Sequence, residues 1–118
     1  MSEKHKSILL KANAAIAEGD YEGFLAFCTE DTVWNFVGDE VLEGKDAVRE
    51  WMEDTYFAPP KIEVDTLIAE GEYLTAIGTV TIKDEDGTDT DYAYCDVWRF
   101  RGDKLFELKA FVIESDDE

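Results

Sequence analysis

The chain has 118 residues, the length of a single domain, and 45% of them are apolar, which suffices for a core without a disulfide or a metal. Its 29 acidic and 11 basic residues give a net charge of −18, which disfavours nucleic acid and anionic membrane surfaces as partners. No apolar run approaches the roughly 20 residues of a membrane span, and no signal-peptide core follows residues 1–6, so we expect a cytoplasmic protein.

Helical periodicity dominates the first part of the chain. Apolar residues at i, i+1, i+4, i+7 and i+8 predict a helix over residues 3–17. Asp20 can cap a second, short helix whose buried side chains we expect to continue as far as Cys28, and the polar residues 29–31 end it. The apolar stripe of the first helix consists of Ile8, Leu9, Ala12, Ala15 and Ile16.

A strand and a third helix come next. The β-branched and aromatic residues 33–37 predict a strand, which Gly38 closes. Residues 45–55 predict a helix whose apolar face includes Trp51. The two prolines at 59–60 end the helical half, because proline lacks an amide donor and restrains the residue before it.

The second half of the chain changes to the two-residue period of β-strands. Four strands joined by short, glycine-containing turns predict an antiparallel meander. Three helices followed by a meander predict an α+β domain with its helices on one face of the sheet. The strands are expected at about 61–69, 73–83, 89–100 and 104–113.

The acidic residues are spread along the chain, and only its end forms an acidic tail. We therefore expect a folded domain over residues 1–113 and a tail over 114–118. The overall acidity is typical of a soluble, monodisperse protein and also of one from a salt-adapted source, and the sequence does not separate these readings.

Alternation along the strand at 89–100 separates two faces. One face carries four aromatic side chains with Asp96 in their middle, and it must be covered, because an exposed patch of this kind would promote aggregation. The last strand can offer apolar side chains to the same face. This face consists of Tyr92, Tyr94, Asp96, Trp98 and Phe100, joined by Phe106, Leu108, Ala110 and Val112, and the opposite face carries Ala93, Cys95, Val97 and Arg99.

Asp96 is the residue that we single out on this face. Aromatic surroundings disfavour the charged form of a carboxyl group, so we expect its pKa to be raised. Such a carboxyl in a concavity can donate a hydrogen bond to a developing oxyanion, or act as a general acid or base. The alternative is a structural aspartate that accepts hydrogen bonds from a Trp, a Tyr or the backbone.

The chain offers few residues for metal or nucleophilic chemistry. Cys28 and Cys95 lie far apart and His5 is the only histidine, which leaves too few soft ligands for a zinc site and disfavours Ser-His-Asp and Cys-His catalysis. We expect both cysteines to be small, buried hydrophobic residues. The sequence has no dinucleotide motif and no evident Schiff-base lysine, so we expect no metal and no cofactor.

Five segments, spread over nearly the whole chain, match a known family in their order and spacing. They are AIAEGD at 15–20, FLAFCTED at 24–31, VWNF at 33–36, LEGKDAV at 42–48 and DVWRFRGDKLFELKAF at 96–111. On these segments the sequence resembles the SnoaL-like, ketosteroid-isomerase-like family of the nuclear transport factor 2-like superfamily. The resemblance implies a cystatin-like, cone-like α+β barrel of three N-terminal helices over a curved, mostly antiparallel sheet, with a deep pocket and commonly a homodimer formed through the sheet.

Family members that isomerise ketosteroids use a strand aspartate as base, and an oxyanion hole made by a helix tyrosine and a protonated aspartate. By position, Asp96 corresponds to the protonated aspartate. The base position falls on Asn35, with one deletion before it, and the tyrosine position falls near Ala12. An amide cannot shuttle the proton and Ala12 has no donor, so we do not expect steroid isomerisation.

Other residues are expected around the same pocket. Asn35 can orient a ligand carbonyl or a water, or else satisfy backbone groups at the end of its strand. Tyr92 and Tyr94 can replace the missing hydroxyl donor, or else pack in the core. We predict Asp96, Asn35 and Tyr94 as catalytic residues. The predicted ligand-binding residues are Trp34, Trp51, Tyr92, Trp98, Leu108 and Val112.

Three functions stay open at this point. The protein can be an enzyme that uses Asp96 for acid–base chemistry of the isomerase, cyclase or hydrolase type on a small hydrophobic substrate. It can bind a small hydrophobic molecule without turnover, or serve as a dimeric interaction module whose pocket is vestigial. All three share the fold, so the fold cannot choose between them.

Overall fold

The computed structural model describes residues 2–114, which form three helices and six strands. Within these residues, no helix has the length and apolar character needed to cross a membrane. The predicted acidic tail includes Glu114, which is the last residue of the final strand, and residues 115–118, which lie outside the described residues. The helices are α1 (Ser2–Ala17), α2 (Tyr21–Leu25) and α3 (Lys45–Thr55), and the strands are β1 (Cys28–Phe36), β2 (Glu40–Glu43), β3 (Lys61–Glu70), β4 (Tyr73–Lys83), β5 (Asp89–Arg101) and β6 (Lys104–Glu114).

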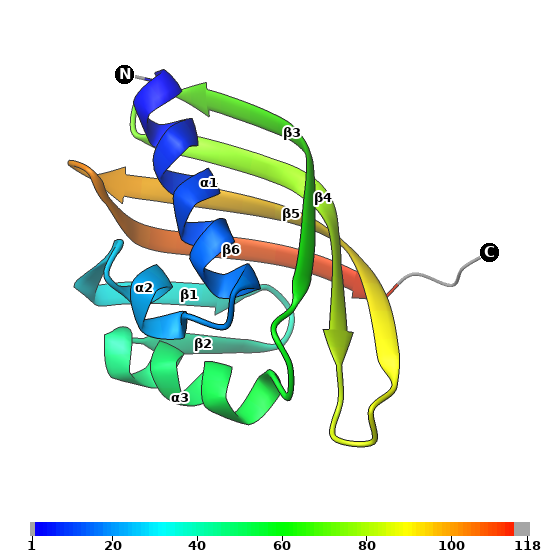
Figure 1. The fold of residues 1–118 in the computed structure, drawn as a ribbon. Helices are drawn as coiled ribbons and strands as arrows, with labels where there is room; N and C mark the ends of the chain where they lie inside the picture. The colour runs from blue at the N-terminus through cyan, green and yellow to red at the C-terminus, as the bar shows by residue number, and fades with distance from the viewer. Residues whose placement is uncertain (1, 115–118) are drawn as a thin grey trace.

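The strands form one curved sheet, and the three helices lie together on one of its faces (Figure 1). The strand order is β2-β1-β6-β5-β4-β3, in which β1 and β6 are parallel and the other neighbours are antiparallel. The sheet does not close into a barrel. The predicted α+β class and the meander β3–β6 are confirmed, and the long strands give the helices a broad face to cover.

Gly78 lies where β3 bends over β4. The register of the two strands shifts between Val64 and Thr66, which marks a bulge. A β-carbon on Gly78 would overlap the carbonyl oxygen of Glu63 and would lie 3.0 Å from the hydroxyl oxygen of Tyr94. The missing side chain therefore allows the two strands and the tyrosine to approach closely, and the bulge adds to the curvature of the sheet.

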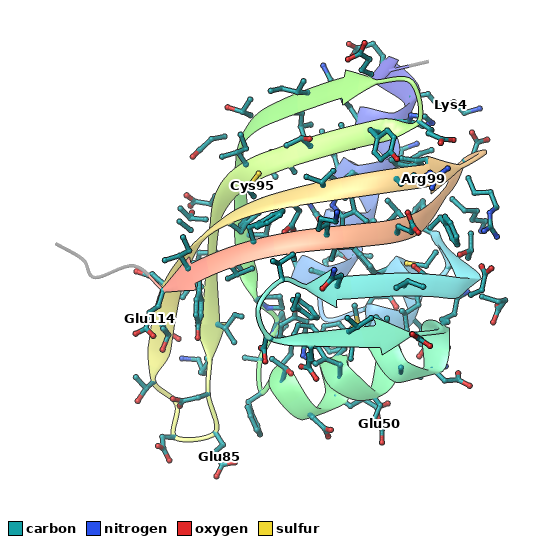
Figure 2. The ribbon with its side chains drawn as sticks, turned by 180° about the vertical axis from the view of Figure 1, so that it is seen from behind. Lys4, Glu50, Glu85, Cys95, Arg99 and Glu114 are labelled. Atoms are coloured by element: carbon teal, nitrogen blue, oxygen red, sulfur yellow. The ribbon has the colours of Figure 1, made fainter. Side chains whose placement is uncertain are left out.

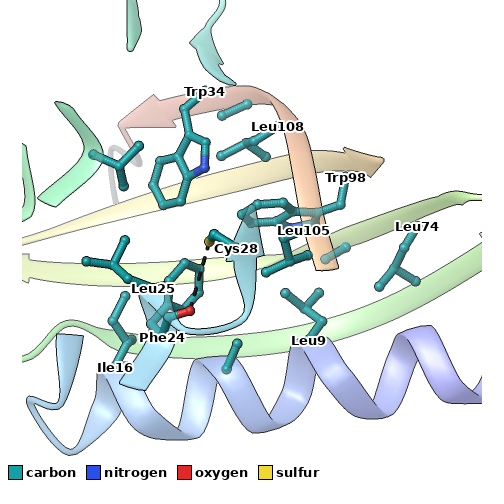
Figure 3. Close-up of a cluster of buried hydrophobic side chains, with 14 of the residues drawn as sticks. Leu9, Ile16, Phe24, Leu25, Cys28, Trp34, Leu74, Trp98, Leu105 and Leu108 are labelled. Atoms are coloured by element: carbon teal, nitrogen blue, oxygen red, sulfur yellow. Dashed lines mark hydrogen bonds between the residues drawn. The ribbon is translucent and has the colours of Figure 1, made fainter. Parts of the chain in front are cut away.

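The core lies between the three helices and the sheet, and Figure 3 shows its part near α1 and α2. Leu9 and Ile16 extend from α1 toward the sheet, and both are buried. The Cys28 thiol lies 3.9 Å from the carbonyl oxygen of Phe24, and burial raises the pKa of this thiol to about 12. Cys28 is therefore a protonated, apolar part of the core, as predicted. The core also includes Leu25, Trp34, Val48, Met52, Leu74, Trp98, Phe100, Leu105 and Leu108.

The prediction for the second helix is wrong at its end. α2 ends at Leu25, and residues 28–31 already belong to β1, which is longer than predicted. The hydroxyl of Thr32 donates a hydrogen bond of 2.7 Å to the carbonyl oxygen of Phe106, which ties β1 to its parallel partner β6. This long-range pairing overrides the local helical pattern. The short edge strand β2 was not predicted either.

Two further residues differ from expectation, Phe106 in its position and Cys95 in its burial. The register of β5 and β6 shifts after Arg99, so Phe106 has no partner in the register and lies beneath the guanidinium of Arg101, 3.7 Å from the ring centroid. Phe106 therefore does not join the inner face. Cys95 is only half-buried, and it lies on the outer face of β5 (Figure 2).

Candidate functional site

A cavity of about 360 Å³ lies between the helices and the inner face of the sheet. Ligand pockets commonly measure about 300–1,000 Å³, so this volume is enough for a small organic molecule. Asp39 and Val112 line the cavity and are exposed, which places its open side near the β1–β2 turn and the end of β6. The other lining residues are Leu9, Asn13, Ile16, Phe24, Trp34, Phe36, Trp51, Thr55, Tyr56, Ile62, Ala76, Val80, Ile82, Tyr92, Tyr94, Asp96, Trp98, Leu108 and Ala110.

The floor of the cavity is hollow because small residues flank Asp96. Asp96 of β5 pairs with Ala76 of β4 on one side and with Ala110 of β6 on the other. Both alanines are buried and line the cavity. Larger side chains at these two positions would fill the space beside the carboxyl group, so their size is part of what makes the cavity.

Asp96 presents a half-buried side chain to this cavity, with one carboxyl oxygen fully buried. Its Oδ1 atom is buried and has no hydrogen-bond partner among residues 2–114. Burial is the cause that raises the pKa of Asp96 to about 7, because desolvation disfavours the charged form. Near neutral pH the group can therefore both release and accept a proton, which a general acid–base residue must do.

Two tyrosine hydroxyls accompany this carboxyl. Burial, followed by the charges of Asp96 and Asp65, raises the pKa of Tyr94 to about 12. Burial and the charge of Asp96 also raise the pKa of Tyr56 above its usual value, with a smaller contribution from Tyr21. Both hydroxyls consequently stay protonated at neutral pH and can donate hydrogen bonds to a ligand.

Aromatic side chains form the walls. The rings of Trp34 and Trp98 meet edge to face with centroids 5.6 Å apart, and Trp51 stacks on Phe36 at 4.9 Å. Such contacts hold the rings in place and leave an apolar wall. The indole Nε1 of Trp34 is buried and has no acceptor among the described residues, which makes it a second unsatisfied polar atom of a cavity-lining residue.

All of the predicted site residues except Asn35 line the cavity. β1 directs Trp34 and Phe36 inward, so the side chain of Asn35 between them leaves on the outer face. Its partner in β6 is the exposed Lys109, which belongs to the same outer face. The expectation that Asn35 contributes to the pocket is corrected by this placement. The inward position on β1 is taken by Trp34, which has no acid–base function.

Four polar lining residues were not predicted, namely Asn13, Asp39, Thr55 and Tyr56. Asn13 lies one turn after Leu9 on the face of α1 that covers the cavity, and its half-buried amide is the polar group that this helix contributes. The spacing of one helical turn from Leu9 already indicated that Asn13 lies on the same face of the helix. Tyr56 follows the last turn of α3, where no periodic pattern applies.

The charge of the lining is uniformly acidic. Asp39 and Asp96 are its two carboxyl groups, and no lysine, arginine or histidine of residues 2–114 lines the cavity. The described part of the chain also contains no group of three or more His, Cys, Asp or Glu residues arranged to hold a metal ion. The site thus presents carboxyl, amide, hydroxyl and indole groups on an aromatic background.

Comparison with known proteins agrees with this architecture. The profile of the SnoaL-like domain matches residues 10–108. The chain belongs to the SnoaL-like domain family. The resemblance predicted from the five sequence segments is thereby confirmed, while no curated protein matches the sequence.

Solved structures with the same fold include several NTF2-like proteins. The epoxide hydrolase/cyclase-like enzyme SalBIII, which has a role in pyran ring formation in the polyether salinomycin, is 24% identical with a TM-score of 0.86, over 93% of this chain and 91% of SalBIII. An NTF2-like protein of unknown function from Burkholderia pseudomallei is 18% identical with a TM-score of 0.79, over 91% and 88%. TerC, co-crystallised with polyporic acid, is 16% identical with a TM-score of 0.78, over 92% and 90%. At these identities the likeness concerns the fold.

Proposed function

We propose that this SnoaL-like protein binds a small, mostly apolar organic molecule in the cavity and transfers a proton on it through Asp96. The observation that carries the proposal is the buried, unpartnered Oδ1 of Asp96 in a cavity of about 360 Å³. A desolvated carboxyl lowers the stability of a fold unless something compensates, and such groups gather at functional sites. The reaction would be of the isomerase, cyclase or hydrolase type.

The proposed roles follow from the geometry. Asp96 serves as the general acid or base, and the hydroxyl of Tyr94 donates a hydrogen bond to an oxygen of the ligand. Trp34, Trp51, Trp98, Tyr92, Leu108 and Val112 form the apolar surface against which the ligand packs. SalBIII, which has a role in pyran ring formation, and TerC, which was co-crystallised with polyporic acid, support small-molecule chemistry on this fold.

A proton-exchange assay tests this function without knowledge of the natural substrate. 2-Tetralone is a bicyclic ketone that is small enough for the cavity and carries exchangeable protons beside its carbonyl group. In D2O, followed by proton NMR, we expect the protein to accelerate the exchange at least about tenfold over buffer, since positioned bases contribute about 10²–10⁴-fold. Asp96→Asn should lose this acceleration, and Asp54→Asn on the exposed side of α3 should keep it. Equal exchange with wild type and Asp96→Asn would remove the catalytic proposal.

A second candidate is binding without turnover. It is favoured by Trp34 and Phe36, because these inward residues of β1 leave Asp96 without a second carboxyl or imidazole deep in the cavity. Ligand binding raises stability by mass action. A saturating rise in melting temperature with 2-tetralone, without exchange of its protons, would favour this reading.

We also propose that the outer face of the sheet forms a homodimer. Among residues 2–114, no helix covers this face (Figure 2). Ile77, Cys95 and Phe111 lie side by side across β4, β5 and β6, and the neighbouring Ile68 and Ile113 are strongly exposed. An exposed apolar face on a chain of such high charge is typical of an interface.

Light scattering coupled to size-exclusion chromatography tests the dimer. We expect a mass of about twice 13.4 kDa for wild type, and the monomer mass for Phe111→Lys with ligand binding retained. A monomeric wild type at micromolar concentration would contradict the proposal.

A further inference from the structure

The charges of the cavity restrict the class of molecule that it can accept. Asp96 lies on its floor and Asp39 at its open side, and the described residues place no basic side chain in its lining. The chain as a whole carries a net charge of −18. Such a field lowers the local concentration of anions and raises that of cations at the entrance. A ligand with a carboxylate or a phosphate would meet no compensating group inside.

The carboxyl of Asp96 requires a partner that the lining does not supply. Its Oδ1 has no hydrogen-bond partner within residues 2–114. A buried carboxylate is stabilised most by a cation that also donates a hydrogen bond, because such charge-assisted bonds are roughly twice as strong as neutral ones. A ligand group that brings both a positive charge and an N–H would therefore complete this site.

The walls favour the same kind of group. Trp34, Trp51 and Trp98 all line the cavity, together with Phe36, Tyr56 and Tyr94. The face of an aromatic ring attracts a cation, by about 0.5–1 kcal/mol at exposed sites and more when the pair is desolvated. Aromatic walls above a carboxyl floor suit an organic ammonium group with an apolar frame.

We infer that the ligand of this cavity carries one basic nitrogen, which lies as an ammonium group beside Asp96 and against the aromatic walls. This inference rests on the proposed function in one respect, namely that the cavity binds a small organic molecule. It adds the substrate class: amines are accepted, and carboxylates of the same shape are rejected.

The bound complex carries the same charges whether Asp96 is protonated or ionised before the amine binds. A protonated Asp96 gives its proton to a neutral amine, and an ionised Asp96 receives an ammonium ion directly. In both cases the bound state contains a carboxylate, which is the form of Asp96 that can accept a proton from the ligand. The other titratable side chains in the lining are Asp39, Tyr56, Tyr92 and Tyr94, and none comes from α1, β3, β4 or β6 among the described residues.

Three matched probes on one bicyclic frame test this inference. They are 2-aminotetralin as the cation, 2-tetralol as the neutral isostere and tetralin-2-carboxylate as the anion, with dissociation constants measured by titration calorimetry at about pH 8. We expect 2-aminotetralin to bind at least about tenfold more tightly than 2-tetralol, which corresponds to about 1.4 kcal/mol. Tetralin-2-carboxylate should bind more weakly than both.

The advantage of the amine should depend on pH in a defined direction. Ionised Asp96 is needed, and burial raises the pKa of Asp96 to about 7. The ratio of amine to alcohol affinity should therefore rise between about pH 6 and pH 8, below the range in which an amine itself loses its proton.

Two variants separate a direct ion pair between the ligand and Asp96 from the effect of the overall negative charge. Asp96→Asn has the same shape and should reduce the ratio to near one, whereas Asp39→Asn at the open side should leave most of it. An equal loss in both variants would overturn the pairing with Asp96. Binding of 2-tetralol as tight as that of 2-aminotetralin would overturn the inference and leave the proposed function standing. Failure of all three probes to bind would overturn both.

Discussion

Replacement of Asp96 by asparagine should stabilise the protein at neutral and alkaline pH. Asparagine keeps the shape of the side chain and removes the charge that burial disfavours. The pKa of Asp96 rises from its ordinary value of 3.8 to about 7 on folding. At about 1.4 kcal/mol for each pH unit, this difference corresponds to about 4 kcal/mol of folding free energy.

The pH dependence of this effect has a definite sign. Because the folded-state pKa lies above the unfolded value, the folded protein binds more protons than the unfolded chain between about pH 4 and pH 7. The stability contributed by Asp96 is thus fully present below about pH 4, falls as the pH rises, and levels off above about pH 7. Asp96→Asn has no carboxyl group at this position, so its stability does not fall in this way as the pH rises.

Urea unfolding followed by tryptophan fluorescence measures the effect, because Trp34, Trp51 and Trp98 all line the cavity. The free energy of unfolding of Asp96→Asn minus that of wild type should grow by about 2–3 kcal/mol between about pH 5 and pH 8. Asp54→Asn, at an exposed carboxyl, should show no such growth. A difference between Asp96→Asn and wild type that stays constant over this range would refute the burial of an unpartnered carboxyl.

Three further predictions concern the cavity and its surroundings. Ala110→Leu should fill the space beside Asp96 and abolish binding of 2-tetralone in a calorimetric titration, with an unchanged circular dichroism spectrum; binding at wild-type affinity would contradict the proposed position of the ligand. Gly78→Ala should lower the free energy of unfolding by about 1–3 kcal/mol in urea, because its β-carbon meets the backbone of β3, and a neutral effect would show that β3 shifts freely. Ellman's reagent should modify Cys95 in the folded Phe111→Lys variant, whose outer face is free, and Cys28 only after unfolding, because burial raises the pKa of the Cys28 thiol to about 12; rapid modification of both would contradict this.

The parts of the fold that depend on local patterns could be predicted from the sequence. Alternation in β5 identified the inner positions of Tyr94, Asp96 and Trp98, because a strand side chain has only two faces to choose from. Prolines and glycines marked the ends of elements for similar reasons. The parallel pairing of β1 with β6 could not be predicted, because it joins residues more than 70 positions apart, and it decided where α2 ends.

The candidate site shows the same division between local and long-range information. Trp34 and Asn35 were both assigned to the pocket, although neighbours on a strand point to opposite faces, and the structure places only Trp34 there. That assignment of Asn35 followed a family position and not the alternation. Tyr56 could not be found from periodicity, because it lies after the last turn of a helix and its place depends on the path into β3.

The ionisation of Asp96 in the free protein is the most direct test of this account. The chemical shift of its side-chain carboxyl carbon, followed by carbon NMR over pH and assigned with Asp96→Asn, reports that ionisation alone. We expect a midpoint near pH 7, which 2-aminotetralin shifts downward. A midpoint near pH 4 would mean that water or a protein donor already stabilises the carboxylate, and neither the proposed proton transfer nor the preference for amines would then have a basis.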